Sequence, residues 1–379
     1  MDKKNKNPNV PNLRFNNDPY KEYNLYEFAT RITRKNKDNV SNLPLTISAQ
    51  YGLVDQVSFF NKTVASKDMS GYYLLKNGEF AYNKSYSNDY PWGAIKRLDL
   101  YDMGCLSTLY ICFKTNDNIV NSNYLVHYFE SSKWHKQVAD IAGEGARNHG
   151  LLNIAVNDFF NTKHAVPTIE NQIKIAGFLD LIEERIQTQI KIIEDYKALK
   201  KKISKQVIGS QKSNTHIYEC LENNSSSSKE SDFDEYTEGQ FPIYGANGVI
   251  KHINSYLIDI PSISIVKDGA GVGRTRFLYG KYTVIGTLNY LTSKNGYNLL
   301  YLYYALDNLD FTKYIVGSGI PHIYFKDYKH EMIYIPKDEK TINKIVRCLS
   351  SLDLLIHNEQ NLLLYLTKQK EYLLNNMFI

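Results

Sequence analysis

The sequence predicts an α+β protein in which two pseudo-symmetric α+β domains are separated by two long helices that form an antiparallel coiled coil. Three observations predict this fold: a helical pattern at residues 168–208, a second one at residues 337–379, and a repeat that relates the two halves of the chain. A chain of 379 residues with 43% hydrophobic content is long enough to bury more than one core.

The first long helix is indicated by apolar residues that recur every three or four positions after Pro167. No Gly or Pro interrupts the pattern after Gly177, and the apolar positions are Ile175, Leu179, Ile182, Ile186, Ile190, Ile193, Tyr196, Leu199, Ile203 and Val207. This is the spacing of a coiled-coil seam. Such a helix spans roughly 60 Å, so it needs an apolar partner along much of its length.

The C-terminal segment supplies a matching seam. Its apolar residues again step by threes and fours, at Ile342, Ile345, Leu349, Leu352, Ile356, Leu363, Leu366, Leu373 and Met377. Glu359 and Lys370 occupy seam positions between them, and polar residues in a seam weaken packing but fix its register. The two seams predict an intramolecular antiparallel pair, while pairing with another protein stays open.

The segments before the two helices show mixed patterns of short strands and helices. In the first, residues 72–75 and 109–113 read as strands and residues 122–138 as one helix; in the second, residues 241–245, 263–266 and 282–285 are β-like and residues 299–306 form a helix. The predicted boundaries are a polar, poorly ordered lead-in at 1–22, a first domain at 23–167, a central helix at 168–208, a second domain at 209–336 and a C-terminal helix at 337–379.

An internal repeat relates the two halves. Pro167 and Pro336 each precede a long helix. Matching residues lie at equal distances from the two prolines: Asp158, Phe159 and Glu170 around the first, and Asp327, Tyr328 and Glu339 around the second. Each half is therefore one α+β domain followed by one long helix, and such pseudo-two-fold symmetry suits a bipartite ligand.

Composition restricts the class of protein only loosely. The net charge of +5 permits nucleic-acid binding without demonstrating it. Four cysteines without any Cys-x-x-Cys pair indicate neither a zinc site nor a disulfide framework, so we expect free thiols in a reducing compartment. Because the chain has no long apolar stretch and no signal-like N-terminus, we expect a cytoplasmic protein.

No catalytic constellation is readable from the sequence. The nine histidines include no His-Glu-x-x-His pair, and no Ser/His/Asp set is evident, so we expect no catalytic residue and no metal site. Residues 269–273, Gly-Ala-Gly-Val-Gly, resemble a phosphate-binding loop, but no Gly-Lys-Ser/Thr follows. We interpret them as a tight turn that leaves Arg274 and Arg276 available for DNA phosphates.

Two Gly-rich loops recur shortly before the Asp-aromatic pairs, at residues 143–150 and 317–322. Glycine permits close backbone approach, and the polar side chains of these loops suit base edges or phosphates. The candidate DNA-binding residues in them are Arg147, Asn148, His149, Ser318 and His322. An ordinary turn with polar decoration is the alternative interpretation.

These residues resemble the specificity subunit of type I restriction-modification systems over nearly the whole chain. The resemblance rests on the duplicated plan, on the stretch Val-Pro-Thr-Ile-Glu-Asn-Gln-Ile-Lys-Ile-Ala-Gly-Phe-Leu-Asp that starts at Val166, and on Pro-Asn-Leu-Arg-Phe at residues 11–15. Residues 65–68 and 78–85, which include Lys84, also resemble the family's first recognition domain. The C-terminal helix matches less closely after residue 339.

The resemblance implies that each α+β domain is a target-recognition domain that reads half of a split double-stranded DNA sequence. The long helices would fix the gap between the half-sites and dock two modification subunits, which carry S-adenosylmethionine and methylate adenine. Restriction subunits, which use ATP and Mg²⁺, would bind to those, and this chain would carry no cofactor and perform no chemistry. The expected docking residues are Ile175, Leu179, Ile186, Leu349, Leu352 and Ile356, and Lys84 joins the DNA-binding candidates.

A different class of function also fits the pattern. Thirty-one tyrosines supply rigid side chains with one polar end, which are useful at any interface. The chain would then be a two-armed coiled-coil adaptor that binds proteins instead of DNA. The salt dependence of duplex binding separates the two hypotheses, because only phosphate contacts give a steep slope.

Overall fold

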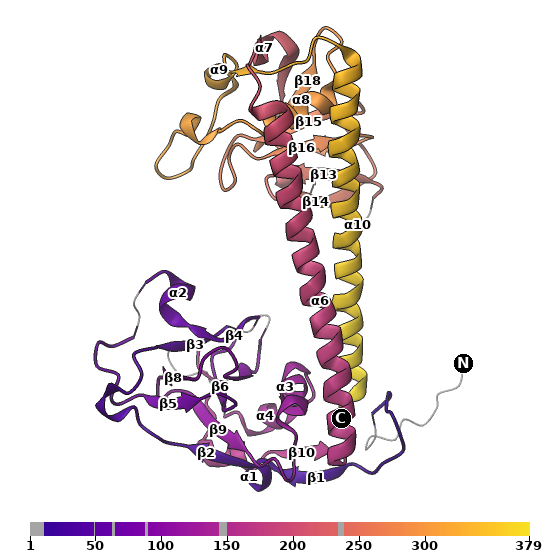
Figure 1. The fold of residues 1–379 in the computed structure, drawn as a ribbon. Coiled ribbons are helices and arrows are strands. Elements are labelled where there is room, and N and C mark those ends of the chain that lie inside the picture. The colour runs from indigo at the N-terminus through magenta and orange to yellow at the C-terminus, as the bar shows by residue number, and fades with distance from the viewer. Residues whose placement is uncertain (1–10, 49, 63–64, 88–89, 144–149, 234–238) are drawn as a thin grey trace. The chain divides into compact units, whose positions relative to one another are not determined.

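The structure, a computed structural model, describes residues 11–48, 50–62, 65–87, 90–143, 150–233 and 239–379, which form two compact units (Figure 1). Unit 1 comprises Met1–Gln189 and Leu362–Ile379, and unit 2 comprises Ile190–Asn361. The two long helices, α6 (Ile169–Ser204) and α10 (Glu339–Met377), each contribute one part to each unit. The predicted α+β fold class is confirmed. The predicted domain boundaries, which separate the helices from the domains, remain predictions.

Unit 1 is built on a four-stranded antiparallel sheet. Its strands, in spatial order, are β2 (Ala29–Ile32), β9 (Ile111–Thr115), β6 (Phe80–Asn83) and β7 (Ala94–Arg97). Aromatic side chains fill the core beneath it: Phe80 stacks on Phe113 with ring centroids 5.3 Å apart, and Tyr82 stacks on Phe159 at 5.0 Å. In β6 the two aromatic residues, Phe80 and Tyr82, are two positions apart and so share one face of the strand.

Smaller elements surround this sheet. They are the pair β1 (Lys21–Asn24) and β10 (Lys163–Val166), the hairpin β3 (Leu45–Ser48) and β4 (Gly52–Asp55), the pair β5 (Tyr73–Lys76) and β8 (Met103–Leu106), and the helices α1 (Leu25–Phe28), α2 (Gln56–Phe60), α3 (Ser122–Glu130), α4 (His135–Ile141) and α5 (Val156–Phe160), with the 3₁₀ turn Lys37–Asn39. Helix α3 packs against β7 at the sheet edge.

Unit 2 repeats the same sheet. The strands lie in the order β12 (Leu221–Ser225), β18 (Leu288–Ser293), β15 (Ser262–Val266) and β16 (Thr275–Leu278). The other elements are β11 (Thr215–His216) paired with β19 (Met332–Ile333), a second sheet of β14 (Gly248–Ile253), β13 (Phe241–Gly245) and β17 (Thr283–Val284), the helices α7 (Ile217–Cys220), α8 (Leu299–Leu306) and α9 (Phe325–Tyr328), and the 3₁₀ turns Glu230–Phe233 and Thr312–Tyr314.

The internal repeat extends to single side chains. Asn121 caps α3 by accepting a hydrogen bond from the Tyr124 N–H at 3.0 Å, and Asn298 caps α8 through the Tyr301 N–H at 3.0 Å. The helix predicted at 299–306 is confirmed, whereas the single helix predicted at 122–138 is wrong. It is two helices, α3 and α4, because Ser131 adopts an extended backbone and its hydroxyl donates to the Tyr128 carbonyl at 2.6 Å.

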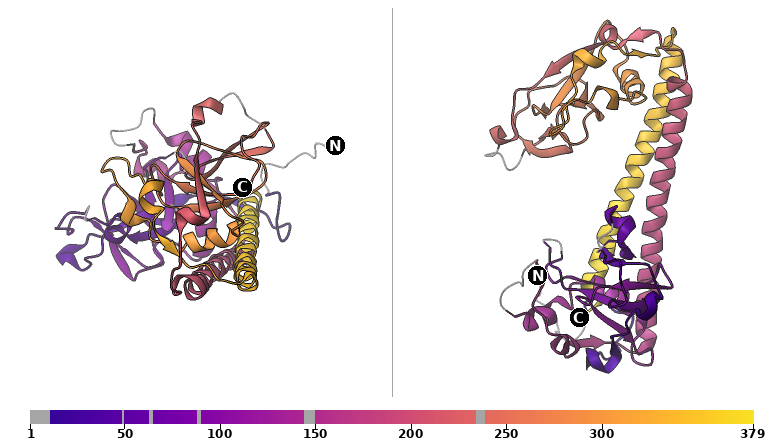
Figure 2. Two further views of the ribbon diagram at one scale, coloured as in Figure 1. Left: turned by 90° about the horizontal axis from the view of Figure 1, so that it is seen from above. Right: turned by 90° about the vertical axis from the view of Figure 1, so that its left-hand side faces the viewer.

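In unit 1 the first part of α6 lies beside the last part of α10 (Figures 1 and 2). The buried side chains in this part are Ile175, Leu179, Ile182, Ile186, Leu366, Leu373 and Met377. Residues of the lead-in pack here too: the Leu13 N–H donates to the Asn376 carbonyl at 2.9 Å, and Phe15 meets Phe178 edge-on at 5.9 Å. The expectation of a poorly ordered lead-in is therefore wrong for residues 11–20.

In unit 2 the last part of α6 pairs with the first part of α10, so the antiparallel pairing predicted from the seams is present in each unit. Ile193, Ile345, Leu349, Leu352 and Ile356 are buried as predicted. Helix α6 ends at Ser204 and continues as the π-helical turn Lys205–Gly209, whose Ile208 joins the domain core.

One predicted seam residue is wrong: Leu199 is 43% exposed. The helical period carries the inward face from Ile193 to Lys200 and then Ser204, so Leu199 falls outside it. Among the described residues, no helix is long and apolar enough to cross a lipid bilayer.

Candidate nucleic-acid interface

The two Gly-rich segments of unit 2 lie against each other. The Gly269 N–H donates to the Pro321 carbonyl at 2.9 Å, the Ile323 N–H donates to the Lys267 carbonyl at 2.9 Å, and Asp268 pairs with His322 in an isolated β-bridge. Residues 267–274 and 316–323, which the sequence suggested separately, thus form one surface. We refer to it as the unit 2 loop pair.

His322 and Ser318 both belong to this surface. The His322 Nδ1 lies 3.7 Å from the Asp268 carboxylate, while Ser318 is exposed at the loop tip. Gly317 adopts φ +94°, and a Cβ there would lie 2.8 Å from the His322 Nε2. Only glycine therefore allows the imidazole to occupy this position.

Arg276 belongs to the edge strand β16, and Arg274 directly precedes it, where the Arg274 carbonyl continues the pairing with β15 by accepting from the Val266 N–H at 3.0 Å. Side chains two residues apart along an extended strand share a face. The Arg276 guanidinium lies 5.8 Å from the centre of the Tyr244 ring and close to Gly248. Within the described part of the chain, neither arginine lies within ion-pair distance of a carboxylate. Both charges are therefore available to an external anion.

Unit 1 has the corresponding arrangement around its Gly-rich loop. The Leu152 N–H donates to the Lys84 carbonyl at 2.9 Å, the Tyr86 N–H donates to the Gly150 carbonyl at 3.1 Å, and Ser85 bridges Leu151. Residues 84–86 therefore lie directly beside one end of this loop. Arg147, Asn148 and His149 lie outside the described residues.

The strand registers show which residues of the two units correspond. Phe80 faces Phe113 and Arg97, and Ile263 faces Leu291 and Phe277, at the same place in each sheet. Four residues further on, Lys84 corresponds to Lys267, and both carbonyls accept the same type of loop hydrogen bond. Sequence reasoning missed Lys267, although a lysine directly after a β-like run in each half was a readable signal.

The correspondence also shows a difference in charge between the units. Lys96 of β7 is in register with Ala81, and Arg276 of β16 is in register with Ser264, so the two cations occupy matching positions. The Lys96 Nζ contacts the Glu130 carboxylate at 3.4 Å, whereas Arg276 has no such partner among the described residues. The sheets are pseudo-symmetric, but at this one position the cation of unit 1 is paired and, among the described residues, that of unit 2 is not.

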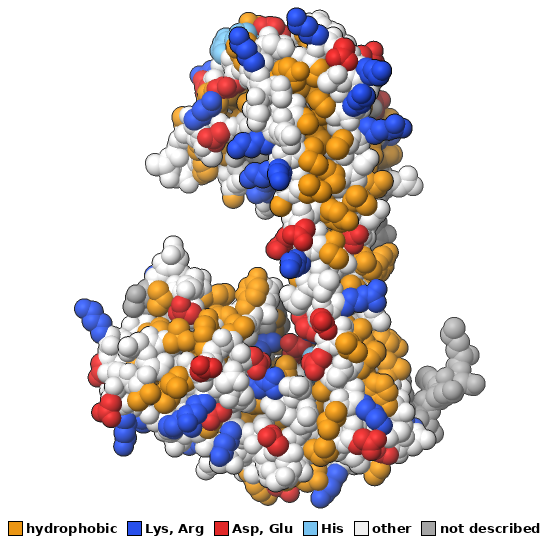
Figure 3. All heavy atoms as spheres, in the orientation of Figure 1, with side chains coloured by type: hydrophobic (Ala, Val, Ile, Leu, Met, Phe, Trp, Pro, Cys, Tyr) orange, Lys and Arg blue, Asp and Glu red, His pale blue; other side chains and the backbone are white. Residues whose placement is uncertain are grey.

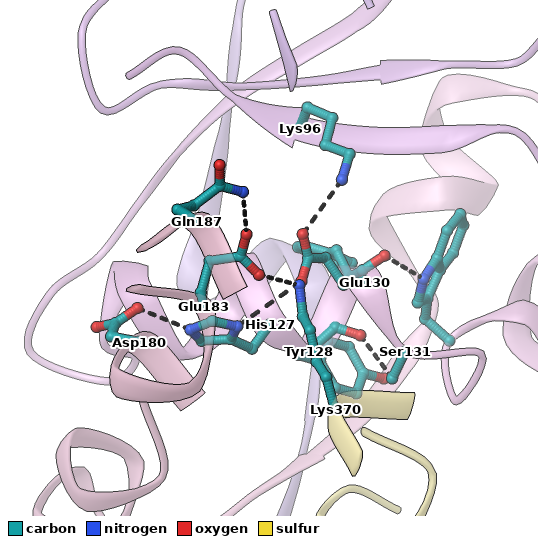
Figure 4. Close-up of polar contacts among 11 residues, drawn as sticks. Lys96, His127, Tyr128, Glu130, Ser131, Asp180, Glu183, Gln187 and Lys370 are labelled. Atoms are coloured by element: carbon teal, nitrogen blue, oxygen red, sulfur yellow. Dashed lines mark hydrogen bonds and ion pairs between the residues drawn. The ribbon is translucent and has the colours of Figure 1, made fainter. Parts of the chain in front are cut away.

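Glu130 belongs to an ionic network that joins α3, β7, α6 and α10 within unit 1 (Figure 4). The Lys370 ammonium lies 2.9 Å from Glu130 and 2.6 Å from Glu183. Burial would raise the pKa of Glu130, but nearby His127, Lys370 and Lys96 outweigh it and hold that pKa well below its usual range. Burial would lower the pKa of Lys370, but Glu130 and Glu183 raise it. Lys370, one of the two polar residues predicted in the seam, is thus a paired charge.

Unit 2 has a related contact between its helices and domain. The Lys200 Nζ lies 2.6 Å from the Asp353 carboxylate, which also accepts a hydrogen bond from the Tyr304 hydroxyl at 2.8 Å. In both units a lysine from one long helix binds a carboxylate of the other, next to a side chain of the domain helix.

The six residues expected to dock modification subunits are buried in the chain's own interior. Ile175, Leu179, Ile186, Leu349, Leu352 and Ile356 expose at most 9% of their surface, so a partner cannot contact them directly. Their docking role is untested. Other apolar side chains lie at the surface of the long helices (Figure 3): Ile173, Leu181, Leu364, Tyr365 and Tyr372 in unit 1, and Leu354 and Leu355 in unit 2.

The groups that would carry metal or thiol chemistry are sparse. No cluster of three His, Cys, Asp or Glu side chains able to hold a metal occurs among the residues that the structure describes. Cys105, Cys112 and Cys220 are buried free thiols, and Cys348 is exposed. Burial raises the pKa of Cys112 and Cys220 to about 12, which disfavours their reactive thiolate form.

Comparison with known proteins agrees with this geometry. The family model described as "Type I restriction modification DNA specificity domain" matches residues 212–372. The S subunit of a type I restriction-modification system from M. genitalium is similar in structure, with TM-score 0.62, 16% identity, and coverage of 98% of this chain and 99% of that one. A second similar structure comes from a study of complex assembly and conformational transition of the type I R-M system. It has TM-score 0.57 and 16% identity, and the match covers 96% of this chain and 99% of that one. No curated protein sequence matches the chain.

The fold is that of an α+β protein with two units that repeat one plan, each of which includes part of both long helices. The family whose model matches residues 212–372 is the one that the sequence was found to resemble. The resemblance inferred from the sequence is thereby confirmed.

Proposed function

We propose that this chain is the DNA sequence-recognition subunit of a type I restriction-modification complex and reads a bipartite double-stranded target. The observation that carries the proposal is the duplicated sheet, which presents a lysine and a loop pair at the same place in each unit. Lysines and arginines would supply salt-dependent affinity for phosphates, while polar loop side chains such as His322 would contact base edges.

The two long helices would set the gap between the half-sites. A helix advances about 1.5 Å per residue and DNA about 3.4 Å per base pair, so one helical turn corresponds to about one to two base pairs. The exposed apolar residues on α6 and α10 would dock two modification subunits. S-adenosylmethionine would belong to those subunits, and ATP and Mg²⁺ to restriction subunits, while this chain performs no chemistry itself.

A domain exchange tests the proposal. Residues 23–163 are replaced by the corresponding segment of another specificity subunit, and the chimaera is assembled with the cognate modification subunit. Methylation of a DNA library should then change at one half-site only, with the other half-site and the spacer retained. A change at both half-sites, or at neither, would contradict the assignment of one half-site to each unit.

The salt dependence of duplex binding would separate this proposal from the adaptor hypothesis independently. A DNA-recognition subunit with several phosphate contacts should lose affinity steeply as salt rises. If the assembled complex shows no salt-dependent duplex binding, the proposed function is wrong.

A further inference from the structure

The turn that follows β15 has an unusual backbone. Gly269, Gly271 and Gly273 adopt φ values of +87°, +84° and +85°, while the intervening Ala270 and Val272 keep negative φ. Alternating signs of φ along successive residues are typical of the backbone nests that bind anions in phosphate-binding loops. The segment is therefore more than a tight turn.

Some N–H groups of this turn are used inside the protein and others are not. Gly269 donates to Pro321, Val272 to Gly269, and Gly273 to Val266, each through the carbonyl oxygen. The N–H groups of Ala270 and Gly271 donate to no acceptor among the described residues. Because the two groups are consecutive and flank a sign change in φ, they can bind the same oxyanion.

A positive charge lies beside these two donors. Arg274 is exposed, and its guanidinium is so close to Gly271 that a Cβ at this glycine would lie 2.6 Å from the Arg274 Nη2. The single acidic neighbour in the turn, Asp268, is partly neutralised because the Lys267 Nζ lies 4.0 Å from its carboxylate. The local charge therefore favours an anion.

We propose that the Ala270 and Gly271 N–H groups and the Arg274 guanidinium together bind one non-bridging oxygen pair of a DNA backbone phosphate. The proposal rests on the proposed function for the source of the phosphate; free inorganic phosphate shares the same chemistry. It assigns the backbone of this turn to DNA positioning, whereas base recognition would remain with neighbouring side chains.

The described residues of the corresponding turn in unit 1 differ at the position of Arg274. Its corresponding turn also begins with a lysine, Lys84, and ends with a left-handed glycine, Gly93, with φ +75°. However, strand register places Ala94 at the position of Arg274, so the guanidinium has no counterpart there. We therefore expect this phosphate contact in unit 2 and not at the corresponding position of unit 1.

The experiment uses the full chain labelled with ¹⁵N-glycine, so that its 21 glycines are the observed amides. The labelled protein is titrated separately with a DNA duplex and with inorganic phosphate. Gly271→Ala identifies the Gly271 signal by its disappearance. We expect that signal to shift with the duplex, and Arg274→Gln to make the salt slope of duplex binding shallower by about 0.9, the value for one phosphate.

Lys281→Gln is the matched control, because it removes one positive charge from unit 2 on a side chain that stacks on Tyr256 outside the turn. It should leave the Gly271 shift unchanged. A Gly271 shift with the duplex supports the proposal whether or not inorganic phosphate reproduces it. A shift with inorganic phosphate alone, or a wild-type protein that binds duplex without moving Gly271, overturns the proposal and leaves the proposed function standing. Absence of any salt-dependent duplex binding by the assembled complex refutes the function itself.

Discussion

Replacing Lys370 by methionine should destabilise unit 1 by leaving two carboxylates without their partner. Methionine keeps the length and apolar contacts of the lysine stem, so the substitution removes mainly the charge. The lysine contacts both Glu130 and Glu183, and its side chain is only 17% exposed. The change therefore isolates the ionic network of Figure 4 from the packing around it.

The magnitude follows from burial and charge. Removing one partner of a buried ion pair costs about 3–5 kcal/mol, but the carboxylates here are 23% and 36% exposed. Solvent screening reduces the expected loss to about 2–3 kcal/mol at neutral pH.

The loss should depend on pH in a definite direction. Burial would raise the pKa of Glu183, but hydrogen bonds from Lys370 and Gln187 and the Lys370 charge lower it, so both carboxyl groups of the network have depressed pKa values. A depressed carboxyl pKa stabilises the folded state above the ordinary value of 4.5, and that contribution disappears as pH falls through the folded pKa. The difference between wild type and Lys370→Met should therefore shrink below about pH 4.5.

Tryptophan fluorescence is a suitable assay because both tryptophans of the chain, Trp92 and Trp134, belong to unit 1. Urea unfolding followed by this signal reports the free energy of unfolding of unit 1. Lys200→Met breaks the related contact in unit 2 and serves as the control, with little expected effect on the tryptophan transition. A loss below about 0.5 kcal/mol at pH 7, or one equally large at pH 3.5, would refute the reasoning.

Two further predictions concern unit stability. His164 is buried with both ring nitrogens hydrogen-bonded, to Tyr128 and Thr162 at 2.8 Å each, and burial lowers its pKa from 6.5 to about 4. A lowered histidine pKa stabilises the folded state above pH 6.5, and this contribution is lost as pH falls toward 4. The free energy of unfolding of unit 1, followed by tryptophan fluorescence, should therefore fall by on the order of 3 kcal/mol across this window. His164→Gln should make this pH dependence of the unfolding free energy weaker. Asn121→Ala and Asn298→Ala should each cost about 1 kcal/mol by removing a helix cap, which circular dichroism during urea unfolding measures, and a negligible cost for either would argue against the cap.

The long helices were predictable because their stabilising contacts repeat with the helical period. The period predicts which face is inward but not which polar residues on that face find partners. Lys370 and Lys200 lie inward because carboxylates from another part of the chain meet them, at Glu183 and Asp353. Leu199 is exposed for the complementary reason, since the inward position beside it belongs to Lys200.

The interface was predictable only in parts. Glycine spacing pointed to residues 269–273 and 317–322, but their contact depends on backbone hydrogen bonds between segments about fifty residues apart. Likewise the break between α3 and α4 depends on a hydroxyl that bonds locally to a carbonyl, a competition that apolar spacing does not encode. Tertiary pairing decided the first case, and a local side-chain hydrogen bond decided the second.

The equivalent edge strands β7 and β16 differ in whether their cation has a carboxylate partner. Lys96 and Arg276 occupy the same place in two sheets, yet Lys96 meets Glu130, which is tied through Lys370 to the long helices. In unit 1 this position therefore contributes to the attachment of the domain to its helices. In unit 2 that attachment uses Lys200, Asp353 and Tyr304 instead, and the Arg276 guanidinium lies over the Tyr244 ring. Equivalent strand positions thus carry a paired cation in unit 1 and a cation without a carboxylate partner among the described residues in unit 2, with the same strand order in both sheets.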